Sequence, residues 1–129
     1  MSVETNTALI RSVVEAFQRG DLATVQSHFA PDAVWDLPGR GPLAGEYKGP
    51  EAIVGFLARA FELSGGTLAL DVLDVMASEH GGTHVQRVTA DHRGRRLDCI
   101  EVIAHEISDG LIVRTYHRPD PYAIDAFFG

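Results

Sequence analysis

The stretch Arg95–His117 constrains the fold more than any other part of the chain. Two extended runs flank Ser108-Asp109-Gly110, and this short polar sequence is typical of the tight turn that closes a β-hairpin. In the first run, Ile100, Val102 and Ile103 make both faces apolar, so we expect a central strand that is covered on both sides. A carboxyl group in such a strand needs a structural or a chemical reason.

A β-strand sends alternate side chains to opposite faces of its sheet, and this alternation groups the polar residues of the hairpin. The residues that share a face are Cys99, Glu101, Ile103 and His105 in the first strand, and Val113, Thr115 and His117 in the second. Glu101 and His105 would lie about 13 Å apart along the strand, a span that suits two ends of one small-molecule cavity. One hairpin could therefore supply a carboxyl group and two imidazoles to a concave face, although the same residues on a half-exposed strand could point outward.

The length and composition of the chain exclude several classes of protein. Because the chain has 129 residues, of which 45% are hydrophobic, we predict a single folded domain over residues 1–129. The net charge of -7 argues against nucleic acid as a partner, since that affinity comes from basic patches. The single cysteine excludes an intrachain disulfide and a cysteine zinc cluster. No apolar run reaches membrane length and the first residues lack a signal-peptide pattern, so we expect a soluble cytoplasmic protein that does not bind a membrane.

Periodicity along the rest of the chain predicts helices first and strands afterwards. The helices are expected at Asn6–Arg19, Leu22–Phe29 and Glu51–Leu63, and the strands at Ala33–Leu37, Thr67–Ala77 and Thr83–His92. Residues 38–49 are expected to form a loop, and Tyr122–Phe128 a short helix or an arm. This order predicts an α+β fold in which a curved antiparallel sheet wraps around the N-terminal helices, as a cone with an internal apolar pocket.

Several short sequence motifs, in the order in which they follow one another along the chain, indicate a known family. They are Gly20-Asp21-Leu22, Phe29–Trp35, Pro38-Gly39, Leu43-Ala44-Gly45, Tyr47-Lys48-Gly49, Asp109–Val113 and Asp120–Asp125. Together they resemble the nuclear transport factor 2-like superfamily, especially its SnoaL-like branch, over nearly the whole chain. The resemblance implies the cone-shaped fold but no single activity, because this fold hosts isomerases, polyketide cyclases, epoxide hydrolases, dehydratases and binding domains.

The resemblance also implies roles for particular residues. Leu97–Val102 resembles the ketosteroid isomerase strand that carries an oxyanion-hole aspartic acid, with Glu101 in the place of that acid, and SnoaL-like cyclases hold a catalytic aspartate at a similar position. Asp36 lies near the position of the isomerase general base, although a one-residue gap would place Leu37 there. The isomerase tyrosines have no counterpart here. Threonines occupy both acid positions of the catalytic residues that epoxide hydrolases use. Neither steroid isomerisation nor epoxide hydrolysis is therefore expected.

These observations select a set of candidate site residues. We expect Glu101 to act as a general acid or base whose pKa is raised by desolvation, assisted by His117, His105 or Asp36. The side chains expected to line the substrate pocket are Trp35, Tyr47, Leu57, Phe61, His84, Gln86, Cys99, Ile103, Val113 and Thr115. In the alternative interpretation, Glu101 pairs with Arg87 or another cation, and the histidines are hydrogen-bonded residues of the pocket wall or rim. The histidines lack the spacing of known metal sites, so no metal is predicted.

The sequence therefore predicts a small-molecule pocket protein that performs cofactor-independent acid/base catalysis on an apolar substrate. The reaction would be of isomerase, cyclase, lyase or hydrolase type, and the sequence does not identify the substrate. The alternative is a non-catalytic small-molecule-binding or dimerisation domain. A meander of this length leaves one sheet face uncovered by helices, and related proteins commonly pair through that face, so a homodimer is expected.

Overall fold

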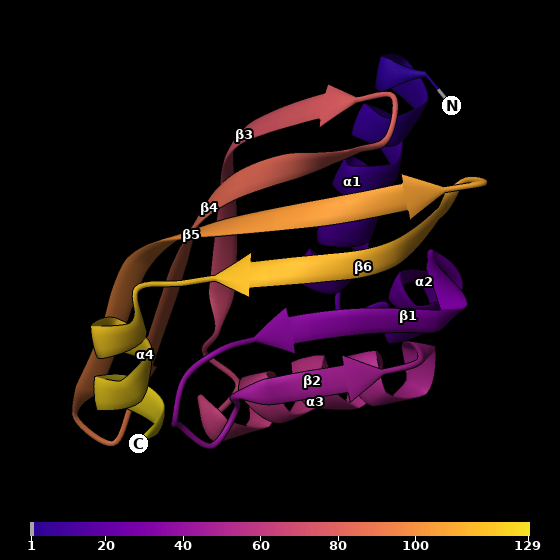
Figure 1. Cartoon of the computed structure of the whole chain (residues 1–129). Helices are drawn as coiled ribbons and strands as arrows, with labels where there is room; N and C mark the ends of the chain where they lie inside the picture. The colour runs from indigo at the N-terminus through magenta and orange to yellow at the C-terminus, as the bar shows by residue number, and fades with distance from the viewer. Residues whose placement is uncertain (1) are drawn as a thin grey trace.

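An open six-stranded sheet forms the largest layer of the protein, in a computed structural model that describes residues 2–129 (Figure 1). The strands are β1 (Phe29–Leu37), β2 (Gly45–Lys48), β3 (Ala69–Ser78), β4 (Gly81–His92), β5 (Arg95–Ser108) and β6 (Leu111–Arg118). They lie in the order β2-β1-β6-β5-β4-β3. The predicted α+β fold is confirmed, but the sheet is mixed, because β6 returns beside β1 and runs parallel to it. The segment expected to be a loop contains the short edge strand β2, which pairs with β1.

Helices cover one face of this sheet. They are α1 (Val3–Gln18), α2 (Leu22–Ser27), α3 (Pro50–Leu63) and α4 (Pro121–Phe128), and Figure 1 shows α1 behind the sheet and α3 alongside β2. Helix α1 begins earlier than predicted, because the Ser2 hydroxyl accepts a hydrogen bond from the backbone N–H of Thr5 and caps it. Helix α2 ends before Phe29, which is buried as the first residue of β1. None of the helices within residues 2–129 is long and apolar enough to cross a lipid bilayer.

The main core lies between the helices and the inner face of the sheet. Helix α1 contributes Ile10 and Val13, and α3 contributes Ile53 and Phe56, so each helix buries one stripe of residues at helical spacing. Trp35 of β1 packs against Phe56 with the ring centroids 5.6 Å apart. This core joins α1 and α3 to the inner face of the sheet, and polar residues of β4, β5 and β6 face an interior cavity beside it.

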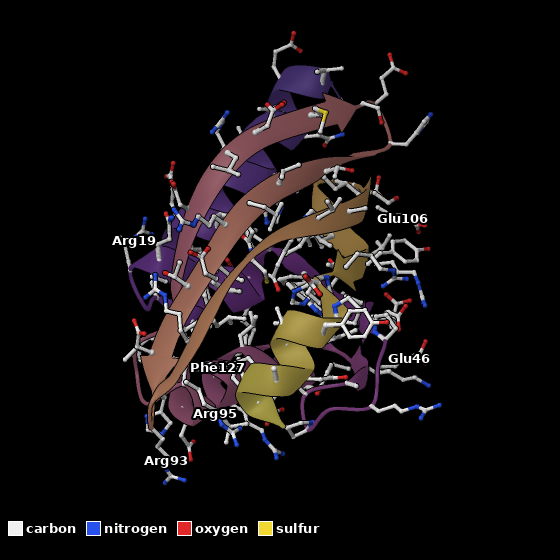
Figure 2. All side chains as sticks on the ribbon, turned by 90° about the vertical axis from the view of Figure 1, so that its left-hand side faces the viewer. Arg19, Glu46, Arg93, Arg95, Glu106 and Phe127 are labelled. Atoms are coloured by element: carbon white, nitrogen blue, oxygen red, sulfur yellow. The ribbon has the colours of Figure 1, made fainter. Side chains whose placement is uncertain are left out.

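Helix α4 closes one end of the cone over a second, smaller core. Phe127 packs there against Val88 and Leu97 from the sheet. The guanidinium of Arg95 donates to the carbonyl groups of Ala126 and Phe127 at the C-terminal end of α4, and Figure 2 labels Arg95 and Phe127 beside this helix. A cation at this position satisfies carbonyl groups that have no partner within the helix.

Strand β5 is central in the sheet, as predicted, but the helices cover only one of its faces. Glu101 and Ile103 point inward and are each 3% exposed, whereas Ile100 and Val102 point outward and are 48% and 43% exposed. The expectation that both faces of this strand are covered is therefore wrong for the single chain, because α1 and α3 pack on the inner face.

The predicted hairpin joins β5 to β6 and contains one irregularity. Past the turn, Ile107 lies opposite Ile112, but the next pair is Glu106 opposite Arg114, so Val113 is the extra residue of a β-bulge. The bulge changes which residues of β6 share a face with the inward residues of β5. Beyond it, the odd-numbered residues of β6 point into the cone.

Candidate functional site

A cavity of about 80 Å³ lies between the inner face of the sheet and the helices. Apolar side chains make up most of its wall, among them Val13 and Phe17 of α1 and Phe56 and Leu57 of α3. The predicted site residues that line it are Trp35, Leu57, His84, Gln86, Glu101, Ile103, His105 and His117. The charged and polar members of this set come from β4, β5 and β6, so one wall carries the groups that can do chemistry.

The carboxylate of Glu101 is held by a hydrogen bond at each oxygen. Gln86 Nε2 donates to Oε1 at 2.7 Å, and His117 Nε2 lies 2.8 Å from Oε2. The Glu101 side chain is 4% exposed and that of His117 is 11% exposed. Trp35 Nε1 donates to His117 Nδ1 at 3.3 Å. Because an indole N–H can only donate, His117 Nδ1 carries no proton, and the ring proton on Nε2 is directed at Glu101.

Polar contacts continue from Gln86 to a buried pair of histidines. Gln86 Oε1 lies 3.1 Å from His84 Nε2, His84 Nδ1 lies 3.1 Å from His105 Nε2, and His105 Nδ1 lies 2.8 Å from Thr115 Oγ1. Strand register explains these contacts. Gln86 lies directly opposite Glu101, and Thr115 lies directly opposite His105, at the spacing where cross-strand side chains meet.

The imidazoles of this cluster are hydrogen-bonded one after another along the wall, and their nitrogen atoms do not converge on one point. The rings of His84 and His105 lie within 10° of parallel, with their centroids 5.2 Å apart, and they meet through a nitrogen of each ring. Across residues 2–129, no group of three or more His, Cys, Asp or Glu side chains is arranged to hold a metal ion.

The environment sets the charge of each group. Burial alone raises the pKa of Glu101, but the adjacent His117 ring and the hydrogen bonds from His117 and Gln86 outweigh it, and the pKa lies below its usual value. The expectation that desolvation raises this pKa is therefore wrong. Burial lowers the pKa of His84, and it lowers that of His105 to about 3. At neutral pH the cluster thus holds the Glu101 carboxylate together with the neutral rings of His84 and His105.

The predicted base Asp36 lies outside the cavity. Alternation along β1 points Trp35 and Leu37 inward, and Leu37 lines the cavity. Asp36 points to the outer face, where its Oδ2 accepts a hydrogen bond from Arg118 Nη2 at 3.2 Å. The residue of β1 that faces the cavity at this level is Leu37, so the prediction of Asp36 as a catalytic base is wrong.

Two aromatic residues expected at the pocket wall lie elsewhere. Tyr47 is on the edge strand β2, where its ring stacks on Phe56 at 4.5 Å and its hydroxyl donates to the carbonyl group of Leu43. Phe61 is 47% exposed and lies in an outer groove. Both predictions for the cavity are wrong, because Phe56 stands between Tyr47 and the cavity and Phe61 faces the outer groove.

Three hairpin residues expected at the wall are also absent from it. Cys99 lies in the smaller core beneath α4, where burial raises the pKa of its thiol to about 11. Val113 is displaced by the bulge and packs against the main core. Thr115 is fully buried behind His105. Thr115 therefore belongs to the polar cluster without contacting the cavity.

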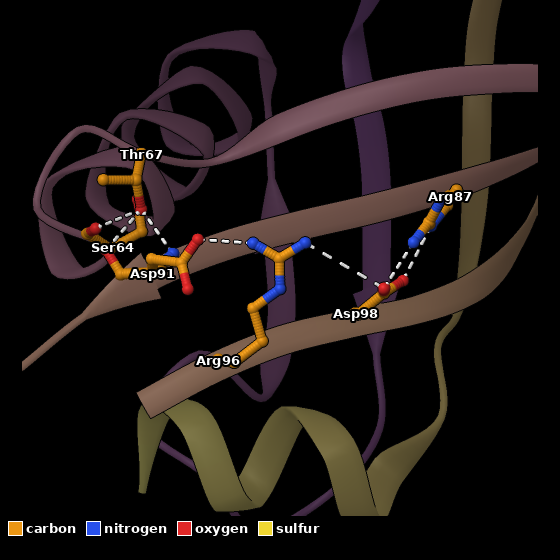
Figure 3. A network of polar contacts seen from close by, with 6 residues as sticks. All are labelled: Ser64, Thr67, Arg87, Asp91, Arg96 and Asp98. Atoms are coloured by element: carbon orange, nitrogen blue, oxygen red, sulfur yellow. Dashed lines mark hydrogen bonds and ion pairs between the residues drawn. The ribbon is translucent and has the colours of Figure 1, made fainter. Parts of the chain in front are cut away.

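The alternative partner of Glu101 is occupied on the opposite face of the sheet. Arg87 makes two hydrogen bonds to Asp98, Nε to Oδ1 at 2.7 Å and Nη2 to Oδ2 at 2.5 Å. Figure 3 shows this pair in a surface network in which Arg96 joins Asp98 to Asp91. Arg87 is therefore not the partner of Glu101, whose carboxylate pairs instead with the ring of His117.

Sequence reasoning missed the part of the wall that the C-terminal segment contributes. Pro119, Ile124 and Phe128 line the cavity. Ile124 and Phe128 are four residues apart on α4, a spacing that places them on one face of a helix. That spacing was the available signal, although it does not indicate which element the helix covers.

A larger groove of about 540 Å³ opens beside the cavity, between the ends of α1 and α3 and the start of β3. Four apolar side chains line both spaces, namely Phe17, Leu57, Leu68 and Leu70. These side chains form the partition between the interior cavity and the groove at the surface.

The chain has an NTF2-like fold that encloses an interior cavity. Residues 10–115 match the family model described as SnoaL-like domain, and the chain belongs to this family, which includes small-molecule-binding enzymes such as cyclases and isomerases. It is 32% identical to an uncharacterized protein of Mycobacterium tuberculosis, over 99% of both chains. It is also similar to the solved structures of Bal32a from a soil-derived mobile gene cassette (33% identity, TM-score 0.94, 98% of each chain) and of a protein with a cystatin-like fold from Xanthomonas campestris (30% identity, TM-score 0.88, 100% of this chain and 99% of that chain).

Proposed function

We propose that this protein is a cofactor-independent acid/base catalyst that acts on an apolar small molecule in the interior cavity. The observation that carries the proposal is the buried pair of Glu101 and His117 in a wall that is otherwise mostly apolar. Each carboxylate oxygen accepts one hydrogen bond from the protein and keeps a lone pair that can take a proton. Glu101 would serve as the base, and the Nε2–H of His117 would hold its carboxylate in place.

The chemistry follows from the charge and the surroundings of this pair. An ionised carboxylate in a site that excludes water can remove a proton from a carbon next to a carbonyl group and return it at another position. Such proton transfers are the common step of isomerisation, aldol cyclisation and elimination, and a carboxylate can also activate water for hydrolysis. The apolar wall would select a substrate with few polar groups.

The sizes of the two spaces suggest how a substrate is accommodated. The interior cavity, at about 80 Å³, is much smaller than typical ligand pockets, whereas the groove beside it measures about 540 Å³. The reacting end of the molecule would lie beside Glu101, and the rest would extend past the partition residues Leu57 and Leu70 into the groove.

A binding protein without catalysis is the second candidate, and one observation favours it. Both oxygens of Glu101 are already engaged by donors of the protein, so the carboxylate is stabilised without a ligand. In this alternative the polar wall would only orient a bound molecule.

Deuterium exchange in D₂O tests the proposal, with cyclohexanone and 2-cyclohexenone as probes and proton NMR as the readout. We expect the parent protein to accelerate exchange of the protons beside the carbonyl group, and Glu101→Gln to lower that rate by about 10²-fold or more. Glu106→Gln is the matched control, because Glu106 lies on the exposed outer face of the same strand. It should keep the parent rate.

Exchange by the parent at the rate of buffer alone would contradict catalysis on this class of substrate. The same probes then distinguish the alternative, because Trp35 is the single tryptophan of the chain and lies in the cavity wall. Saturable quenching of its fluorescence without exchange would support a binding protein.

A further inference from the structure

The polar cluster extends well beyond the two residues that the proposed chemistry uses. Four further side chains follow one another away from Glu101 in the order Gln86, His84, His105 and Thr115. All four are buried, at 0% to 5% exposed. We call these four side chains the file. Each hydrogen bond along the file needs one donor and one acceptor, so the choice of donor at one bond fixes the donor at the next.

Only one arrangement of protons serves an ionised Glu101. The carboxylate cannot donate, so the amide nitrogen of Gln86 faces it and the amide oxygen faces His84. His84 must then donate from Nε2, which leaves its Nδ1 to accept from His105 Nε2. His105 Nδ1 is left to accept the hydroxyl proton of Thr115. Every donor in the file therefore points toward Glu101.

The opposite arrangement serves a group that donates at the position of Glu101. Gln86 would turn its amide by half a rotation, both imidazoles would carry their proton on Nδ1, and the Thr115 hydroxyl would accept. Each side chain in the file can adopt either role, since Gln, neutral His and Thr all contain both a donor and an acceptor. The group at the Glu101 end therefore decides the direction of the whole file.

We propose that Gln86, His84, His105 and Thr115 are positioning residues, a hydrogen-bonded file whose direction is set by Glu101 and which in turn keeps Glu101 an ionised base. The file presents a fixed N–H to Oε1, while His117 holds Oε2. It orients the carboxylate and does not conduct protons, because the amide of Gln86 within it does not ionise. The catalytic part of this inference rests on the proposed function, whereas the direction of the file does not.

The surroundings of Glu101 leave few other groups that could set its charge. The titratable side chains near it are His117 on β6, His84 on β4 and Cys99 on its own strand. The residues of α1 and α3 that face the cavity are apolar, among them Val13 and Leu57. Because burial raises the pKa of the Cys99 thiol to about 11, this group stays uncharged while Glu101 titrates, and a change in the titration of Glu101 can be traced to the file or to His117.

Nitrogen-15 NMR of histidine-labelled protein reports which ring nitrogen carries the proton. In the parent at pH 7 we expect the Nε2–H form at both His84 and His105. In Glu101→Gln the new amide can donate to Gln86, so we expect both histidines to change to the Nδ1–H form. His105 does not touch Glu101, so a change at His105 requires the file.

Two control variants separate the ends of the file. Thr115→Val removes the last hydroxyl with little change of shape, and the parent forms should persist because Glu101 still sets the direction. Glu106→Gln, on the outer face, should also leave both rings unchanged. An unchanged His105 in Glu101→Gln, or an Nδ1–H form in the parent, would overturn the proposal.

A second measurement follows the effect of the file on the pKa of Glu101. It can be made even if the Glu101→Gln variant does not fold, because it does not use that variant. Carbon-13 NMR of the side-chain carboxyl gives its pKa in the parent and in Gln86→Leu. Loss of the bond to Oε1 should raise that pKa by roughly 1 to 2 units, and an equal pKa in both proteins would overturn the positioning role.

If the ring forms and the pKa respond as expected while no probe exchanges, the proposed function fails and the file stands. If exchange depends on Glu101 but neither NMR readout responds, the file fails and the proposed function stands.

Discussion

Acidification should destabilise the protein through one buried side chain, His105. Burial lowers its pKa in the folded protein to about 3, whereas a histidine in an unfolded chain titrates near 6.5. Between about pH 6.5 and pH 3, the unfolded chain binds a proton at this residue that the folded protein does not bind. Stability therefore falls as the pH falls through this window, and it is fully retained above it.

The size of the effect follows from proton linkage. One proton of difference changes the free energy of unfolding by about 1.4 kcal/mol for each pH unit. Between pH 6.0 and pH 4.5, where most carboxyl groups have not yet titrated, His105 alone should cost about 2 kcal/mol. That loss lowers the melting temperature of a chain of this size by roughly 6 to 10 °C. His84, whose pKa burial also lowers, acts in the same direction.

Urea unfolding at several pH values between 7.0 and 4.5 measures this dependence. His105→Gln keeps a polar side chain in the file but removes the titration, so its stability should depend less on pH by about one proton. His80→Gln is the matched control, because His80 is exposed in the turn between β3 and β4, and its dependence should equal that of the parent. If the parent and His105→Gln show the same dependence on pH, then His105 takes up a proton in the folded protein and the reasoning is refuted.

Two further predictions concern other parts of the molecule. We propose that two copies of the chain pair through the outer face of the sheet, where Ile100 and Val102 are about half exposed. Light scattering should give twice the mass of one chain, and the double variant Ile100→Glu with Val102→Glu should give the mass of one. A parent that scatters as one chain at high concentration would contradict this pairing. Cys99 is 8% exposed and its pKa is raised to about 11, so at pH 8 a thiol reagent should label the native protein at least about 10²-fold more slowly than the unfolded protein. Equal labelling rates would show that this thiol is accessible and ionised in the fold.

Much of the fold was predictable because it depends on local patterns. Asp109 and Gly110 form the predicted turn with φ angles of 53° and 77°, a conformation that a sequence of this type favours. Alternation along β5 placed Glu101, Ile103 and His105 on one face, and all three line the cavity. The resemblance of ordered phrases to the SnoaL-like family is confirmed by the match over residues 10–115.

The errors in the site arose where a residue's neighbours come from distant parts of the chain. Desolvation of Glu101 was predictable from the apolar residues beside it, but the lowered pKa depends on Gln86 and His117, which two other strands bring to its two oxygens. Cys99 has the same inward parity as Glu101. It lies in a separate core because α4 covers that end of the strand.

The sequence by itself determined the hairpin, the alternation within each strand and the family to which the chain belongs, since each depends on residues that are close in the chain or on their order. The tertiary structure decided which strands lie side by side and in which register. A bulge at Val113 shows the difference. Without it, the pairing next to the turn would continue unshifted and place His117 opposite Val102, on the outer face. The extra residue moves His117 opposite Ile103 and into the cone, because one unpaired residue reverses the face of every residue that follows it in a strand.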